Sequence, residues 1–284
     1  MIEVASHVVE IVSDSGEGAQ KCGQAFAALA AQSGNGVWTS EIIPAEIQPP
    51  ARSVAGASGC RVRIGSTPVT NGGDEADLVV AFNEQVLLGR AHAGELGAGC
   101  TILLESAWRD HPDAAIASAW RTAREQLVAA GHRVVEVPIE ERARRLLDDP
   151  RRGKNMFVLG LLAQVYGFSR ELAHEQVGVA LSKKDEALVA RNRALVDEGM
   201  AWAAENLALR VRVPPMPEGE AHVVMNGNTA LALGILASGM EVCAMYPITP
   251  ATSASHLLSE IFAEVGGIVH QAEDEIAAAS FAIG

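Results

Sequence analysis

Short apolar runs rich in β-branched residues alternate with segments of helical periodicity along the first half of the chain. Strands are predicted at residues 8–12, 37–43, 61–64, 78–82, 101–104 and 133–137. Helices are predicted at residues 20–32 and 114–130, and Gly34 and Gly131 follow them as C-terminal caps. Strands that alternate with helices are typical of an α/β fold whose mainly parallel sheet is covered on both faces.

The pattern changes in the second half of the chain. Residues 140–154 are densely charged, and residues 155–207 have an almost wholly helical pattern, which predicts a helical extension of the first domain. Residues 214–219 read Pro-Pro-Met-Pro-Glu-Gly and predict a stiff, solvated linker, because proline restricts the backbone and cannot join a sheet ladder. The predicted domains are therefore residues 1–213 and residues 220–284.

A second α/β unit is expected to begin with a strand at residues 222–225. Its remaining predicted elements are strands at residues 242–245 and 268–270 and a helix at residues 277–283. About 65 residues with two or three strands cannot close a doubly wound domain. We therefore expect this unit to be incomplete and the chain to be part of a longer polypeptide.

Composition and charge narrow the function classes. The formal net charge of −13 argues against nucleic acid or an anionic membrane as the main partner. The N-terminus lacks a basic, apolar signal sequence, and the most apolar region, residues 229–248, is too interrupted to span a bilayer. These features predict a cytoplasmic protein.

The four cysteines lie far apart, at Cys22, Cys60, Cys100 and Cys243, and form no C-x-x-C pair. Their spacing fits neither a zinc site nor an iron–sulfur loop. We therefore expect reduced thiols and no metal ligands on this chain, so any iron–sulfur cluster would belong to another chain.

Three motifs of the second unit follow one another at points where ligands bind in α/β proteins. Asn226-Gly227-Asn228-Thr229-Ala230 opens a helix, where Asn228 or Thr229 could cap the helix and free N–H groups could hold a polar ligand. Tyr246-Pro247-Ile248-Thr249-Pro250 follows a predicted strand, and carboxyl ends of strands are where ligands bind. Residues 271–275, Gln-Ala-Glu-Asp-Glu, precede an Ala-rich helix.

Taken singly, each motif has a structural interpretation: a turn and cap, a strand exit, and acids that favour a helix N-terminus through its dipole. Their order and spacing together favour a binding site.

This order resembles the start of the α subunit of 2-oxoacid:ferredoxin oxidoreductases, relatives of pyruvate:ferredoxin oxidoreductase. The resemblance implies that residues 220–284 begin the pyrimidine-binding domain of a thiamine diphosphate site. The N-terminal region resembles the γ domain of the same family in its Ser15-Gly16-Glu17-Gly18 turn, its Pro44-Ala45-Glu46-Ile47 loop and the strands at residues 61–64 and 77–83. It departs from the family at Ala19 and Lys21, where glycines are usual, and at residues 48–52, where an arginine–glycine pair is usual, so no ligand role is assigned to these loops.

The resemblance also implies roles for individual residues. Glu275 matches the glutamate that hydrogen-bonds the aminopyrimidine ring, favours its imino tautomer and so activates the cofactor for attack on the 2-oxo carbon. Gly227, Asn228 and Thr229 are expected to contact the cofactor. Tyr246, Pro247, Ile248, Thr249 and Pro250 are expected to form the substrate segment, with Thr249 at the carboxylate of the 2-oxoacid.

Partners are implied in the same way. The diphosphate with its Mg²⁺ and the [4Fe-4S] cluster would be held by a separate β subunit, electrons would pass to ferredoxin, and the acyl group would pass to coenzyme A. The fused γ–α arrangement without cluster cysteines favours 2-oxoglutarate as the 2-oxoacid.

Two alternatives remain at this stage. The first is a non-catalytic nucleotide-binding α/β protein, suggested by Gly16-x-Gly18 after a strand and by Glu41 as a ribose-binding acid, although Lys21 occupies the place of the third glycine. The second is a different thiamine enzyme, decarboxylating or transketolase-like, which would have no need of the segment at residues 246–250.

Overall fold

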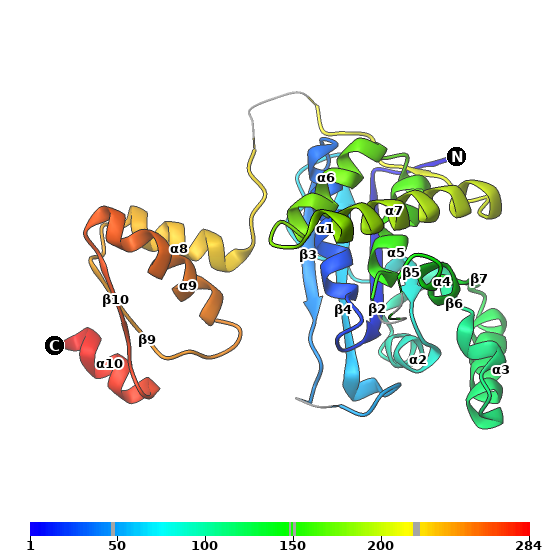
Figure 1. Ribbon diagram of the computed structural model, residues 1–284, viewed down its shortest axis with the longest axis horizontal. Helices are drawn as coiled ribbons and strands as arrows, with labels where there is room; N and C mark the ends of the chain where they lie inside the picture. Colours follow the sequence, from blue (N-terminus) through cyan, green and yellow to red (C-terminus); the bar gives the residue numbers. More distant parts are fainter. Residues whose placement is uncertain (47–48, 148, 150–151, 218–221) are drawn as a thin grey trace. The chain divides into compact units, whose positions relative to one another are not determined.

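The computed structural model describes residues 1–46, 49–147, 149, 152–217 and 222–284. The chain forms two compact units, Met1–Gly219 and Glu220–Gly284, which we call unit 1 and unit 2. Figure 1 follows the chain through both. Residue 47 of the family-like loop at residues 44–47 and residue 48 of the segment at residues 48–52 lie outside the described residues. The same holds for residues 218 and 219 of the expected linker.

Unit 1 is built on a six-stranded sheet with the order β3-β4-β2-β5-β6-β7. These strands are β2 (Ser6–Asp14), β3 (Gly36–Ile42), β4 (Ala57–Gly65), β5 (Ala76–Ala81), β6 (Leu96–Glu105) and β7 (Arg133–Val137). The pairs β2–β5, β5–β6 and β6–β7 are parallel, whereas β4 is antiparallel to both β2 and β3. The predicted mainly parallel α/β fold is confirmed.

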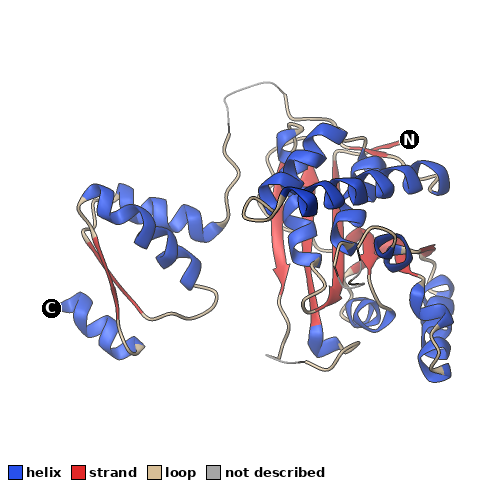
Figure 2. Ribbon diagram, viewed as in Figure 1, coloured by secondary structure: helices blue, strands red, loops and turns tan. Residues whose placement is uncertain are grey.

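Helices cover both faces of this sheet, as Figure 2 shows. They are α1 (Ala19–Gln32), α2 (Glu84–His92), α3 (Ala114–Ala129), α4 (Ile139–Arg144), α5 (Lys154–Tyr166), α6 (Arg170–Ala180) and α7 (Glu186–Asn206). One apolar core joins α1, α5, α6 and α7 to the face carrying Ile11 and Val62, and the other joins α2 and α3 to the face carrying Val12 and Val79. The alternation of side chains along each strand thus supplies both cores.

Two glycines bring α5 and α7 into close contact. A Cβ atom at Gly160 would lie 1.9 Å from the carbonyl oxygen of Val196, and one at Gly199 would lie 2.0 Å from that of Phe157. Only glycine permits this approach, so the helical extension packs backbone against backbone over the sheet.

A short parallel pair links the two ends of unit 1. Strand β1 (Ile2–Glu3) pairs with β8 (Val211–Arg212), with Ile2 opposite Val211. Beyond β8, Asn35 Nδ2 donates to the carbonyl oxygens of Val213 and Pro214, and the Met216 N–H donates to Gly34 at 2.8 Å. Residues 214–216 therefore lie along unit 1, which corrects the expectation of a wholly solvated linker.

We propose that the domain boundary lies within residues 217–221, and limited proteolysis provides a test. The hydrogen bonds that attach residues 214–216 to unit 1 protect the start of the linker, so the first cleavage is expected after Met216. Mass spectrometry of the first fragments locates the cut. First cleavage between Leu78 and Leu104, inside the sheet of unit 1, would contradict this boundary.

Unit 2 contains α8 (Gly227–Ala237), β9 (Val242–Met245), α9 (Thr252–Ile261), the 3₁₀ turn η3 (Phe262–Val265), β10 (Ile268–Gln271) and α10 (Glu275–Ile283). β9 and β10 form a two-stranded parallel sheet. Ala232, Leu258 and Phe262 are its buried apolar core, and partly buried residues such as Cys243 and Val269 pack against them.

The predicted strand at residues 222–225 is wrong: these residues have no regular structure. A strand exists only where a neighbour accepts and donates its backbone hydrogen bonds. Within the described part of the chain, β9 and β10 pair only with each other. Val223 is consequently 79% exposed in spite of its apolar pattern.

In the described part of the chain, no helix is long and apolar enough to cross a membrane. The four cysteines are free thiols, and burial raises the pKa of Cys60 and of Cys100 to about 12. The described residues contain no group of three or more His, Cys, Asp or Glu side chains arranged to hold a metal ion.

Candidate functional site

Helix α8 begins with a side-chain cap that differs from the predicted one. Asn226 has an extended backbone, and its Oδ1 accepts a hydrogen bond from the Thr229 N–H at 2.8 Å. The expectation that Asn228 or Thr229 caps the helix is wrong, because the capping residue must precede the first helical turn and Gly227 already belongs to it. The side chain of Asn228 is therefore left for other partners.

Asn228 contacts the segment at residues 246–250. Its Nδ2 donates to the carbonyl oxygen of Pro250 at 2.7 Å and to Ser253 Oγ at 2.6 Å. Two of the three predicted motifs are thus in direct contact although more than twenty residues separate them in the sequence.

The segment at residues 246–250 leaves the carboxyl end of β9. Tyr246 is half-buried, whereas the following four residues are exposed, and the Thr249–Pro250 peptide bond is cis. Thr252 anchors the far side of the segment, since its N–H and its hydroxyl both donate to the carbonyl oxygen of Ile248. Thr249 is therefore presented at the surface by a backbone that is bonded on both sides.

The third motif begins at the same edge of the sheet. β9 and β10 are parallel and Met245 lies opposite Gln271, so the segments that follow both strands start side by side, as can be followed in Figure 1. Asp274 caps α10 by accepting a hydrogen bond from the Ala277 N–H at 2.7 Å. Glu275 is the first residue of α10 and is exposed.

Helix α10 is held against its strand by an aromatic contact. The rings of His270 and Phe281 stack with centroids 3.9 Å apart and planes 11° from parallel. Because His270 is in β10, this contact fixes the direction of α10 and hence the place of Glu275 at its first turn. The structure thus brings all three motifs to one edge of the small sheet.

A second group of polar residues lies in unit 1, at the carboxyl ends of its parallel strands, and sequence analysis missed it. Lys154 is only 2% exposed, and its Nζ lies 2.9 Å from Glu17 Oε1 and 3.0 Å from Glu140 Oε2. Burial alone would lower the pKa of Lys154, but the two carboxylates outweigh it and raise that pKa. Glu17, the glutamate of the turn at residues 15–18, therefore forms an ion pair inside unit 1.

Arg52 forms a neighbouring buried contact. It has φ of 53°, its N–H donates to Asp14 Oδ2 at 2.8 Å, and its guanidinium pairs with Glu84 and lies 4.8 Å from the centre of the Trp108 ring. The predicted loop thus delivers an arginine into the carboxyl edge of the sheet. Two sequence signals could have pointed to these buried charges. They are Lys154, at the start of an apolar helix, and Arg52, shortly after two prolines.

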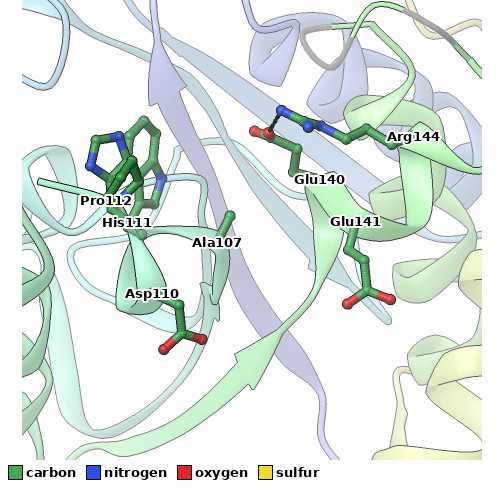
Figure 3. A pocket seen from close by; sticks show the side chains of 8 residues that line it. Ala107, Asp110, His111, Pro112, Glu140, Glu141 and Arg144 are labelled. Carbon is green, nitrogen blue, oxygen red and sulfur yellow. Dashed lines mark hydrogen bonds and ion pairs between the residues drawn. The ribbon is translucent and has the colours of Figure 1, made fainter.

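A groove of about 490 Å³ opens between the residues after β6 and helix α4, and Figure 3 shows the side chains around it. Its lining residues are Ala107, Trp108, Asp110, His111, Pro112, Glu140, Glu141 and Arg144. Trp108 and His111 stack at 5.6 Å, and Arg144 is paired with Glu140 at 2.6 Å. The lining has three carboxylates and one arginine, and that arginine is already paired with Glu140, so the groove does not favour an anionic ligand.

The buried carboxyl group of Glu105 is expected to make the stability of unit 1 depend on pH. Burial raises the pKa of this carboxyl to about 7, although the Ala107 and Glu140 N–H groups and Lys154 act against the rise. Because the folded pKa lies above the ordinary 4.5, the favourable contribution of Glu105 is complete below about pH 4.5 and is lost as the pH rises through 7.

The free energy of unfolding that is lost in this way is at most about 3 kcal/mol, since each pKa unit corresponds to about 1.36 kcal/mol. Urea unfolding of the wild type and of Glu105→Gln between pH 5 and 8 measures it. We expect the free energy of unfolding to fall with pH more steeply in the wild type than in the variant. Equal pH dependence in both proteins would exclude Glu105 as its source.

Comparison with known proteins defines the class. Residues 8–202 match the family model described as pyruvate ferredoxin/flavodoxin oxidoreductase, and residues 234–284 match that described as pyruvate flavodoxin/ferredoxin oxidoreductase, thiamine diphosphate-binding. The chain belongs to the pyruvate ferredoxin/flavodoxin oxidoreductase family, and the predicted resemblance is confirmed. The second match contains residues 246–250 and Glu275.

Particular relatives narrow the comparison. The chain is 32% identical to the 2-oxoglutarate oxidoreductase subunit KorA of Mycobacterium tuberculosis over 98% of its own length and 44% of the relative. It superposes with a TM-score of 0.78 and 27% identity on a 2-oxoglutarate:ferredoxin oxidoreductase from Magnetococcus marinus with 2-oxoglutarate, coenzyme A and succinyl-CoA bound, covering 98% of this chain and 45% of that one. The chain thus spans less than half the length of either relative.

One more structure matches a large part of the chain. The γ subunit of a keto/oxoacid ferredoxin oxidoreductase from Geobacter sulfurreducens superposes with a TM-score of 0.51 and 19% identity, covering 71% of this chain and 98% of that one. At this identity the likeness concerns the fold. The non-catalytic nucleotide-binding alternative finds no support in these comparisons, and Glu41, its expected ribose ligand, is hydrogen-bonded to Gln24 at 2.7 Å.

Proposed function

We propose that this chain supplies the γ and α parts of a thiamine-diphosphate-dependent 2-oxoacid:ferredoxin oxidoreductase, with 2-oxoglutarate as the 2-oxoacid. The observation that carries the proposal is the meeting of the segments at residues 246–250 and 272–275 at one sheet edge, inside the range matched by a thiamine diphosphate-binding family model. The choice of 2-oxoglutarate is supported by the names of the similar proteins from M. tuberculosis and M. marinus.

The donor set of unit 2 fits the pyrimidine end of thiamine diphosphate. Asp274 uses a carboxylate oxygen to cap α10, which leaves Glu275 as an exposed carboxylate in the first turn of that helix. A carboxylate accepts a hydrogen bond from a protonated ring nitrogen, and we assign this contact to Glu275. When bound, the cofactor supplies the electron sink that decarboxylation of a 2-oxoacid requires.

Thr249 is assigned to the carboxylate of the 2-oxoacid. Its hydroxyl and N–H are donors, and the prolines at 247 and 250 restrict the backbone around it, so little conformational freedom is lost on binding. Tyr246, Pro247, Ile248 and Pro250 form the rest of the substrate segment. Gly227 and Thr229 at the start of α8 remain proposed cofactor contacts. Gly227 is exposed, whereas the Thr229 N–H already donates to Asn226 Oδ1, so Thr229 would use its hydroxyl.

The other components are proposed to lie outside this chain. A β subunit would hold the diphosphate, Mg²⁺ and a [4Fe-4S] cluster, ferredoxin would accept the electrons, and coenzyme A would accept the acyl group. The proposal is supported by the M. tuberculosis relative, which is a subunit, and by the M. marinus structure, which has coenzyme A bound. A cytoplasmic location is part of the proposal, because ferredoxin and coenzyme A are the expected reaction partners.

The proposal is tested with the assembled oxidoreductase. Addition of 2-oxoglutarate and coenzyme A is expected to reduce ferredoxin or a viologen dye, and omission of coenzyme A is expected to abolish turnover. Pyruvate at the same concentration serves as the comparison substrate. A greater rate with pyruvate would change the assigned substrate, and no reduction with either 2-oxoacid would overturn the proposed reaction.

Thr249→Ala provides a residue-level test. The substrate carboxylate loses a hydrogen bond from a preorganised donor, which costs about 1–3 kcal/mol of transition-state stabilisation. The value of kcat/KM for the 2-oxoacid is therefore expected to fall roughly 5- to 150-fold. Thiamine diphosphate affinity should stay the same. Thr249→Ser keeps the hydroxyl and is the matched control. Kinetics of Thr249→Ala equal to those of the wild type would remove Thr249 from the substrate site.

A further inference from the structure

The donor capacity of the Asn228 side-chain amide is committed within the protein. An asparagine amide nitrogen carries two hydrogens, and the two acceptors of Asn228 Nδ2 are the Pro250 carbonyl oxygen at 2.7 Å and Ser253 Oγ at 2.6 Å. No donor hydrogen is left for a bound cofactor. Asn228 therefore differs from Gly227 and Thr229, with which the sequence pattern grouped it.

The two acceptors lie on either side of the start of helix α9. That helix begins at Thr252 after Ala251, which provides no side-chain cap. Asn226 meets the capping requirement of its own helix, so Asn228 is free to reach across to the next one. One side chain at the first turn of α8 thereby joins the end of the substrate segment to the first turn of α9.

We infer that Asn228 is a positioning residue that holds Thr249 in its binding orientation through Pro250 and Ser253. The inference rests on the proposed function and deepens it. The Pro250 carbonyl belongs to the Pro250–Ala251 peptide. Because the proline ring restricts φ, a bond that fixes this peptide also restricts the Thr249–Pro250 peptide beside the Thr249 donors. The second bond, to Ser253, prevents the amide from rotating about its last torsion and keeps the first bond aligned.

Asn228→Ala, assayed in the assembled oxidoreductase, is expected to lower kcat/KM for 2-oxoglutarate about 3- to 10-fold, as expected for loss of ordinary hydrogen bonds. Asn228→Asp should have the larger effect, since its carboxylate would face the Pro250 carbonyl without a donor. Ser253→Ala should reproduce part of the loss, and Ser253→Thr, which keeps the hydroxyl, should restore it. Ser259→Ala, which removes a hydroxyl bond to Ser255 farther along α9, is the matched control.

A double-mutant cycle with Thr249→Ala separates positioning from simple loss of stability. If Asn228 acts through Thr249, Asn228→Ala should cost less than about twofold in the Thr249→Ala background, because interacting residues are not additive. The Kd of thiamine diphosphate and the Tm should remain those of the wild type. Additive losses, or a tenfold weaker cofactor Kd with an unchanged KM for 2-oxoglutarate, would overturn the inference.

Hydrogen exchange tests the same residue without any assay of turnover. Peptides covering residues 246–255 are expected to exchange faster in Asn228→Ala than in the wild type or in Ser259→Ala. Equal exchange rates would overturn the inference even if the enzyme oxidises 2-oxoglutarate. An assembly that oxidises no 2-oxoacid but shows faster exchange in Asn228→Ala would instead reject the proposed reaction and keep the contact.

Discussion

Replacement of Glu275 by glutamine is expected to slow the enzyme by about 10²- to 10⁴-fold, the range for loss of an acid–base group. Glutamine preserves the size of the side chain and its place in the first turn of α10. It cannot hold a proton as a carboxylate does, so under the proposed assignment the cofactor ring would lose the partner that activates it. Exchange of the thiazolium proton for deuterium, measured in the assembled oxidoreductase, reports this step directly.

The neighbouring acids are the controls for Glu275. Glu273→Gln alters an exposed carboxylate two residues earlier and is expected to leave the exchange rate unchanged. Asp274→Ala removes the cap of α10 and is expected to cost about 1 kcal/mol of stability. Near-normal exchange in Glu275→Gln would transfer the role to Glu273, and near-normal exchange in both glutamine variants would reject the thiamine diphosphate site.

Lys154→Met is expected to lower the free energy of unfolding of unit 1 by about 3–5 kcal/mol, the range for breaking a buried ion pair by removing one partner. The change leaves Glu17 and Glu140 near each other without the ammonium group that lies 2.9 and 3.0 Å from them. Methionine fills most of the volume of the lysine stem, so the loss is one of charge pairing. Urea unfolding followed by circular dichroism measures it.

Two further variants identify the origin of this loss. Lys183→Met changes an exposed lysine and should leave the stability within about 0.5 kcal/mol of the wild type. Glu17→Gln combined with Lys154→Met removes one of the unpaired charges and should recover part of the stability. A loss below about 1 kcal/mol in Lys154→Met would show that solvent reaches the ion pair and screens it.

The sheet of unit 1 could be predicted from sequence because most of its strands contain a recognisable apolar run. Both faces are covered, so buried apolar runs such as residues 78–82 stand out, and Gly131 follows α3 with φ of 90°. The run at residues 222–225 has the same character and forms no strand. Whether such a run forms a strand depends on a neighbouring strand to pair with, and the residues of the run itself do not show whether that neighbour exists.

The candidate site was predictable at the level of motifs and not of contacts. The segment at residues 246–250 and Glu275 follow strands that pair in register, and this much could be inferred from their order. The sequence did not reveal that Asn226 caps α8 while Asn228 reaches Pro250, since both residues are good caps. The pairing of Glu17 with Lys154 spans 137 positions, and only the folded chain brings such residues together.

The pairing of β1 with β8 has a consequence for how the protein is made. Ile2 and Val211 are paired, and Glu3 contacts Arg212 across 209 positions of the chain. During synthesis, residues 2 and 3 must therefore wait until residues 211 and 212 have been made before their partner strand exists. Contacts of such long sequence separation form late and slow folding. The β1–β8 pair is thus expected to close only after the strands and helices between its two members have been made.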